Sequence, residues 1–264
     1  MFKDSCFGHF LSVSECLDVQ LTLLHQLIRR QVNNNDSDNA IYFSICNNQV
    51  RFSVVDFALI TGLKCHGVTE SAVREQSSAV IGVRERYFKG MKSIRRQDIE
   101  VVLNAQSPIE DEKDVGILQL CLIYFVSNVL LSANKENFVA DLYFQLVNDM
   151  DNFNLYDWGS VTWFKTRESI RNTGLIIRAA EKANKEPNYN LYGFPIVLQI
   201  WSYEVLPSLA ARFAAPIKAR APRLCAWKTV QKPSGKVLME LVFGKSKVFL
   251  KNRVWYVIAC HRIL

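Results

Sequence analysis

The residues best suited to metal binding stand near the start of the chain, where Cys6, His9 and Cys16 occur close together. A structural zinc site takes four ligands, commonly in two tight pairs. No second pair follows this one in the sequence. The spacing therefore favours a buried thiol and a helix-start histidine over a metal site.

Two further cysteines are directly followed by histidine, at Cys65-His66 and Cys260-His261. Neighbouring side chains on a strand point to opposite faces, so neither pair predicts a nucleophile with its base. The glycine-rich phosphate loops GxxxxGK[ST] and GxGxxG are also missing. We expect no enzymatic activity, no cofactor, no metal and no small-molecule substrate.

Three carboxylates stand in apolar surroundings. Glu204 lies within an apolar helical stretch, where an ionised carboxylate needs a cationic partner or a proton. We predict a buried ion pair with Arg167 or Arg171. Asp56 and Asp157 are better explained as helix caps or arginine partners than as catalytic acids.

Cations gather in two parts of the chain. Residues 84–96 mix six of them with Tyr87 and Phe88, which suits phosphate contacts with stacking, or else a solvated helix face with two core anchors. Residues 212–264 hold 12 Lys/Arg and one acid, a local charge of +11, against 20 basic and 24 acidic residues in the rest. Such a segment can bind nucleic acid or an acidic protein, or can simply be a soluble surface. The candidate contact residues are Arg84, Arg86, Lys89, Lys92, Arg95, Arg96, Lys245, Lys247, Lys251 and Arg253.

The stretch Gly193–Pro207 predicts the helix on which the core is built. Proline is tolerated in a first helical turn, so Pro195 marks the start. The residue before a proline is biased away from helix, so Pro207 marks the end. The residues between are apolar around nearly the whole circumference, which indicates a helix surrounded by other elements. The apolar run 117–133 predicts a second buried helix, against which the first would pack.

Hydrophobic periodicity assigns the remaining elements. Alternation over 41–52 predicts a β-hairpin turning at Asn47-Asn48, and Ser53 and Gly62 can cap a short helix between them. Further helices are expected over 17–30, 93–103, 137–149 and 160–183, and β-rich runs over 226–230, 237–243, 247–250 and 254–258. The fold class is thus α+β and mainly α-helical, with a buried central helix, a small N-terminal hairpin and a C-terminal basic β-meander. We expect a helical domain over 5–221 and a basic β-rich extension over 222–264, packed on it or leading to a further region.

The compartment follows from the cysteines and the N-terminus. Seven cysteines at irregular positions suit reduced thiols, and the first residues lack the build of a signal peptide. The run 117–133 has 17 residues and includes polar side chains, which favours a core helix over a membrane span. We expect a nuclear or cytoplasmic protein that has no membrane partner.

Five stretches occur along the chain in this order: CFGHFL at 6–11, VRFSVVDFALITGL at 50–63, YDWG at 156–159, YGFPIVLQIWSYEVLP at 192–207 and APRLCAW at 221–227. The set, over roughly residues 5–227, resembles the plant-specific domain of unknown function numbered nineteen-eighty-five, which is distantly similar to the plant mobile domain. The resemblance implies a protein of Mutator-like transposable elements, in which the domain precedes a cysteine protease for ubiquitin-like modifiers. It implies no catalytic residue, because no activity belongs to the family.

Two functions remain open at this point. The first is a non-catalytic interaction module of a transposable-element-derived plant protein, which binds protein or nucleic acid. The alternative is a targeting or substrate-presenting domain of a ubiquitin-like-protein protease. The protease itself is not expected here, because none of the four histidines stands in the setting that such an enzyme requires.

Overall fold

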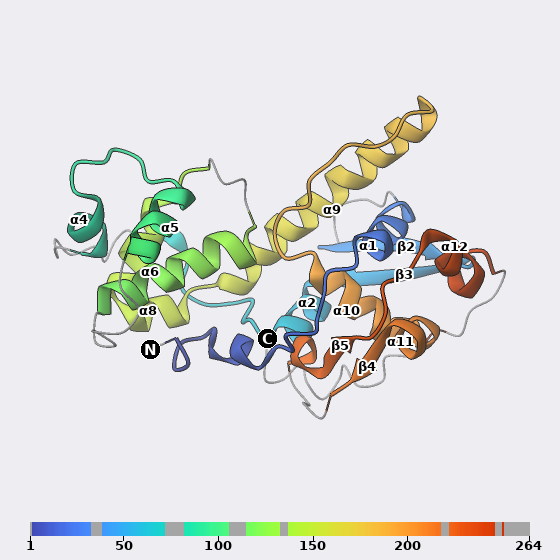
Figure 1. The fold of residues 1–264 in the computed structure, drawn as a ribbon, viewed down its shortest axis with the longest axis horizontal. Helices are drawn as coiled ribbons and strands as arrows, with labels where there is room; N and C mark the ends of the chain where they lie inside the picture. The colour runs from blue at the N-terminus through green and yellow to red at the C-terminus, as the bar shows by residue number, and fades with distance from the viewer. Residues whose placement is uncertain are drawn as a thin grey trace. The chain divides into compact units, whose positions relative to one another are not determined.

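The computed structural model describes residues 2–32, 39–71, 82–105, 115–132, 137–217, 222–245 and 250. The fold is α+β and mainly helical, as the sequence predicts, with small antiparallel sheets (Figure 1). The chain divides into two compact units. Unit 1 comprises Met1–Gly8 and His66–Trp158, and unit 2 comprises His9–Cys65 and Gly159–Leu264.

Unit 1 consists of short helices around an aromatic cluster. Its helical segments are α4 (Val83–Phe88), α5 (Arg96–Ala105), α6 (Val115–Phe125), the π-helical η3 (Val126–Leu130), α7 (Asp141–Asn148) and α8 (Met150–Leu155). Helix α6 packs against α4, α5 and α7. The Trp158 ring lies 5.1 Å from that of Phe153 and 5.7 Å from that of Phe7, between centroids.

The apolar run predicted as one helix is α6 continued by the single π-helical turn η3. Its buried side chains, among them Leu120, Ile123, Val126 and Leu130, belong to the core of unit 1. Within the described ranges, no helix combines the length and the apolar character that crossing a membrane requires.

Unit 2 is built around α10 (Ile196–Val205) and a sheet of β1 (Gln31–Val32), β2 (Ala40–Ile45) and β3 (Asn48–Ser53), in the order β1-β2-β3. The other elements are η1 (Gly8–Ser12), α1 (Leu21–Ile28), α2 (Val54–Thr61), α9 (Trp158–Lys182), α11 (Pro207–Phe213), β4 (Ala214–Pro216), η4 (Arg223–Ala226), β5 (Trp227–Thr229), α12 (Gly235–Leu238) and the π-helical η5 (Met239–Phe243).

Helix α10 is the central helix that the two prolines predict. It follows Pro195, and Pro207 is the first residue of α11. Its Trp201 is fully buried, with ring centroids 5.3 Å from Phe43 and 5.5 Å from Phe52 of the sheet. Helix α10 packs against α1, α2 and α11 of its own unit (Figure 1). The sequence predicts that the run 117–133 packs against this helix, but that run belongs to unit 1 and α10 to unit 2. Apolar composition indicates that a helix is buried and does not identify its partner.

The predicted hairpin is β2–β3, paired from Ala40↔Ser53 to Ile45↔Asn48. The turn is Cys46-Asn47, one residue earlier than predicted. Their φ angles are 50° and 63°, and a two-residue type I′ turn needs positive φ at both positions. The additional strand β1 pairs with β2. Its two residues are too few to show an alternating pattern.

The predicted C-terminal β-meander is wrong over 237–243, which is helical in α12 and η5. Ser234 caps this segment, because its hydroxyl accepts the Val237 N–H at 3.3 Å. Leu238 and Val242, four residues apart, are both fully buried. A strand would place Glu240 on the same face as these two residues, but Glu240 is exposed, so the burial pattern is that of a helix. The expected strand over 226–230 is present as β5, which pairs with β4. The runs 247–250 and 254–258 lie outside the described residues, apart from Leu250.

Candidate functional site

The basic segment 84–96 begins with α4 in unit 1. Val83 and Phe88 at its two ends are each 3% exposed, so they anchor the helix to the core. The chain then turns back, with the Met91 N–H donating to the Phe88 carbonyl at 3.0 Å and Gly90 at a φ of 80°. The segment is therefore a folded surface that presents several cations. Of the two predicted core anchors, Phe88 is buried, whereas Tyr87 is only half-buried and Val83 is the second anchor.

Two of the six cations predicted over 84–96, Arg84 and Arg96, form contacts within the fold. Arg84 donates to Asp141 Oδ1 at 3.1 Å and to the carbonyls of Met91 and Lys92 at 3.0 and 3.2 Å, which holds the turn against the start of α7. Arg96 is 9% exposed and donates to Asn128 Oδ1 of η3. Burial lowers the pKa of Arg96. Both guanidinium groups thus use their Nε and one Nη in contacts that hold the fold.

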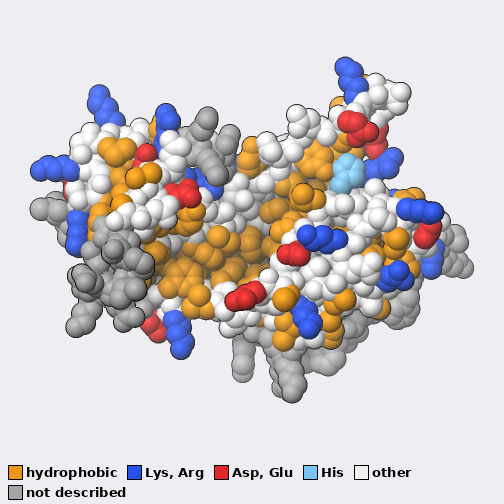
Figure 2. Space-filling model, viewed as in Figure 1, with side chains coloured by type: hydrophobic (Ala, Val, Ile, Leu, Met, Phe, Trp, Pro, Cys, Tyr) orange, Lys and Arg blue, Asp and Glu red, His pale blue; other side chains and the backbone are white. Residues whose placement is uncertain are grey.

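The other four cations, Arg86, Lys89, Lys92 and Arg95, are exposed, and we call them the basic surface. Glu85 is the one acid among residues 84–96. The Arg86 guanidinium carbon lies 5.3 Å from the centroid of the Tyr87 ring. Figure 2 shows Lys and Arg side chains projecting from the part of unit 1 that carries α4 and α5. The arrangement can bind an extended anion.

Of the four cations predicted near the C-terminus, Lys245 lies within the described residues. Lys245 is exposed just after η5, where its N–H donates to the Val242 carbonyl at 3.1 Å. Lys247, Lys251 and Arg253 lie outside the described residues. A contact surface formed by these four residues stays a prediction.

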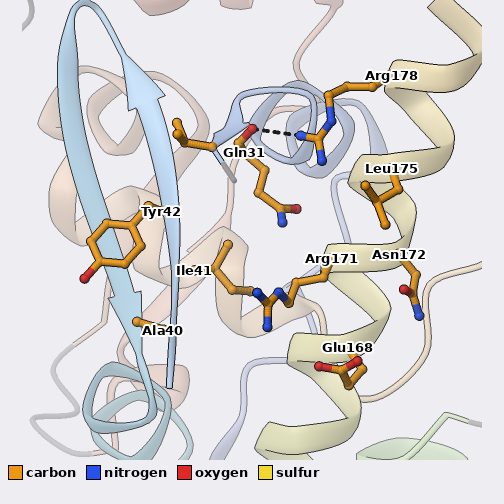
Figure 3. Close-up of a pocket in the computed structure, with 10 residues that line it drawn as sticks. Gln31, Ala40, Ile41, Tyr42, Glu168, Arg171, Asn172, Leu175 and Arg178 are labelled. Carbon is orange, nitrogen blue, oxygen red and sulfur yellow. Dashed lines mark hydrogen bonds between the residues drawn. The ribbon is translucent and has the colours of Figure 1, made fainter. Parts of the chain in front are cut away.

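Unit 2 contains a pocket of about 330 Å³ that sequence reasoning missed. It lies between α9 and the strands β1 and β2, and Figure 3 shows the Gln31 and Arg171 side chains reaching into this space. Arg178 donates to the Gln31 carbonyl at 2.9 Å and so covers the edge of β1. The lining residues are Gln31, Val32, Ala40, Ile41, Tyr42, Glu168, Arg171, Asn172, Leu175 and Arg178.

The sequence shows that Arg171 and Arg178, seven residues apart, can lie on one face of a helix. It does not show the strand edge that completes the pocket, because β1 has only two residues. The lining side chains can donate and accept hydrogen bonds. They include no serine, cysteine or histidine, so the described lining supplies none of the usual nucleophile–base pairs.

The histidines whose rings have described partners bond to structural groups. His9 Nε2 lies 2.7 Å from the Thr61 carbonyl oxygen, to which it must donate. His25 Nδ1 lies 2.7 Å from the Tyr189 hydroxyl. His66 is exposed, and His261 lies outside the described residues. No group of three or more His, Cys, Asp or Glu within the described ranges is arranged to hold a metal ion.

The predicted partner of Glu204 is wrong. Glu204 Oε1 accepts from the Trp227 indole N–H at 2.9 Å. Arg167 instead donates to Asn39 Oδ1 at 2.6 Å and lies 3.5 Å from Glu168. The carboxylate is half-buried, so a neutral donor and solvent satisfy it.

Asp56 is a helix cap, as predicted, since its Oδ2 accepts the Ser53 N–H at 2.7 Å.

The fold and these sites define a mainly helical α+β domain that carries an exposed basic surface. The chain belongs to the family described as Domain of unknown function (DUF1985), whose model matches residues 28–169. The match contains VRFSVVDFALITGL, YDWG and the basic surface, and it leaves the other three stretches that carry the resemblance outside. No curated protein and no solved structure matches the chain.

Proposed function

We propose that this domain is a non-catalytic interaction module that binds nucleic acid through the basic surface. The observation that carries the proposal is the exposure of four cations within residues 86–95, against one acid in the segment. Lys and Arg that neutralise phosphates release condensed counterions, which drives binding of any sequence. Phosphate contacts position a protein without reading bases, so we expect weak sequence preference.

The turn that carries these cations is already ordered before binding. Arg84 fixes it through Asp141 and two backbone carbonyls, so little backbone conformational entropy remains to be lost when a ligand binds. A module from a transposable-element protein, the context that the sequence resemblance implies, would have a use for such a surface. The absence of catalysis is part of the proposal, and the structural partners of His9 and His25 support it.

The test replaces Arg86, Lys89 and Lys92 together with Gln and measures binding to a labelled DNA duplex by fluorescence anisotropy over a salt series. Each phosphate contact contributes about 0.9 to the slope of log affinity against log salt, so the loss of three contacts lowers that slope by about 2.7. The matched control replaces Lys182, Lys185 and Arg212, three exposed cations of unit 2, with Gln. This control should leave the slope almost unchanged.

Two results would contradict the proposal. One is a wild-type protein that binds neither duplex nor single-stranded DNA at low salt, which would leave a protein as the ligand. The other is a control variant that lowers the slope as much as the test variant, which would mean that net charge alone matters. A parallel variant with Gln at Lys245, Lys247, Lys251 and Arg253 examines the competing C-terminal set. If this variant alone flattened the slope, the contact surface would lie there instead.

A further inference from the structure

Phe138 is a large aromatic side chain that the fold leaves in solvent. The sequence predicts a helix over 137–149 that includes Phe138, but α7 begins only at Asp141. Phe138 precedes the helix and is 61% exposed. Leaving a phenyl ring in water forgoes the free energy that its burial would provide. Its exposure beside the basic surface therefore suggests a binding role.

The position of Phe138 is fixed by the backbone. Phe138 forms an antiparallel bridge with Arg95, and the Val139 N–H donates to the Ile94 carbonyl at 2.8 Å. Val139 and Ile94 are 7% and 2% exposed, so each neighbour is anchored in the core. The bridge therefore holds the backbone of Phe138 beside that of Arg95.

Arg95 completes a mixed aromatic and cationic surface. Its guanidinium carbon lies 5.7 Å from the centroid of the Phe138 ring, within the usual range of a cation–π contact. Its backbone N–H donates to Asp98 Oδ2 at 2.7 Å, which fixes the start of α5. Asp141, the carboxylate at the start of α7, is paired with Arg84. Arg95, one of the four cations of the basic surface, therefore lies beside an exposed ring.

From this geometry we infer that Arg95 and Phe138 form a stacking platform for an unpaired base, so that the basic surface takes single-stranded nucleic acid. The inference rests on the proposed function. Planar rings and guanidinium groups stack on the face of any base. In a duplex these faces are already stacked on each other, so only a single strand can use the platform together with the cations.

The test compares three labelled probes of about 12 nucleotides, a length that one binding site can cover. They are a single strand, a duplex and an abasic strand, which keeps the phosphates but has no bases. Phe138→Leu keeps the apolar bulk and removes the aromatic face. A base can no longer stack on the ring, so this variant should bind the single strand about tenfold more weakly. Its affinity for the duplex and the abasic strand should not change.

Phe164 provides a matched control. It is 60% exposed, and the Arg167 guanidinium carbon lies 5.8 Å from its ring centroid. Arg167 is committed to Asn39 and Glu168, so Phe164→Leu should leave binding to all three probes unchanged. Arg95→Lys is a second test, because it keeps the charge and loses the planar guanidinium. We expect this variant also to weaken single-strand binding selectively.

The outcomes separate the platform from the basic surface. Equal wild-type affinity for the three probes, or a Phe138→Leu variant with normal folding and unchanged single-strand affinity, overturns the platform. If the triple Gln variant at Arg86, Lys89 and Lys92 still weakens all binding in that case, the proposed function stands without the platform. Wild-type protein that binds no probe at low salt contradicts both.

Discussion

At the scale of single residues, the buried side chains of Gln20, Gln199 and Tyr203 form a hydrogen-bonded network in unit 2. Gln199 in α10 accepts the Gln20 N–H at 2.7 Å and donates to the Asp18 carbonyl at 2.9 Å. The Tyr203 hydroxyl donates to Gln20 Oε1 at 2.8 Å, and burial raises the pKa of this tyrosine. A buried group without a partner costs free energy, so this network fixes the segment before α1 against the central helix.

The two half-buried histidines predict how stability depends on pH. Burial lowers the pKa of both His9 and His25 below the ordinary histidine value of about 6.5. The folded state therefore favours the neutral rings, and the unfolded chain binds protons more readily as the pH falls. Linkage then makes the free energy of unfolding largest above the unfolded pKa and smaller as the pH falls through it. Chemical denaturation between about pH 7.5 and about pH 5 should show this loss.

His9→Gln keeps an N–H donor for the Thr61 carbonyl and removes the titrating ring. Its stability should fall less between the two pH values than that of the wild type. His66→Gln, at an exposed position, serves as the control and should follow the wild-type profile. An identical pH dependence in the wild type and in His9→Gln would show that burial of His9 has no part in it.

At the scale of elements, α2 is bounded at both ends by side-chain and backbone geometry. Ser53 and Asp56 form a capping box, in which each side chain accepts the backbone N–H of the other. At the other end, Gly62 has a φ of 73° and donates its N–H to the Ala58 carbonyl at 2.8 Å. These local signals explain why the helix has the bounds that the sequence predicts.

Gly62→Ala should destabilise the protein by about 1–2 kcal/mol, because a residue with a Cβ is strained in the left-handed region. The new Cβ would also lie 3.0 Å from Pro222 Cβ, which must shift to accommodate it. Gly235→Ala is the matched control, since Gly235 begins α12 and an added Cβ would meet nothing within 4 Å. Urea denaturation should show a lower midpoint for the first variant only. Equal midpoints for the two variants would mean that the left-handed position is not strained.

At the scale of the whole molecule, the two units have separate cores. Trp201 belongs to the core of unit 2, between α10 and the sheet, whereas Trp158 lies in the aromatic cluster of unit 1. The chain passes from one unit to the other after Gly8, Cys65 and Trp158. A change in one core should therefore act first on the elements of its own unit.

Trp201→Ala should destabilise unit 2 by about 3–5 kcal/mol, as the truncation of a large buried aromatic does. Hydrogen exchange followed by mass spectrometry should show faster exchange in α2, α10 and β2 of unit 2. Exchange in α6 and α7 of unit 1 should change much less, because locally stable regions open independently. Equal acceleration in both units would show that the protein unfolds as one cooperative body.

The sequence by itself determined the features that depend on residues within one or two turns. Pro195 and Pro207 bound the central helix, Ser53 and Gly62 bound α2, and alternation defined the hairpin up to one residue in its turn. Each follows from backbone sterics or from a hydrogen bond between near neighbours. The family match over residues 28–169 agrees with the resemblance that the ordered motifs carry.

Some residues look equivalent in the sequence but have different roles, and only the tertiary structure decided which role each one has. Arg84 and Arg86 are alike in the sequence, but Asp141, more than fifty residues away, engages the first and leaves the second on the surface. Phe138 has the spacing of a core residue, yet its bridge to Arg95 keeps it outside the helix and in solvent. The run 237–243 is apolar enough for a strand, but Leu238 and Val242 are buried while Glu240 between them is exposed, as in a helix. Such outcomes depend on contacts between distant parts of the chain, which local propensity and periodicity do not contain.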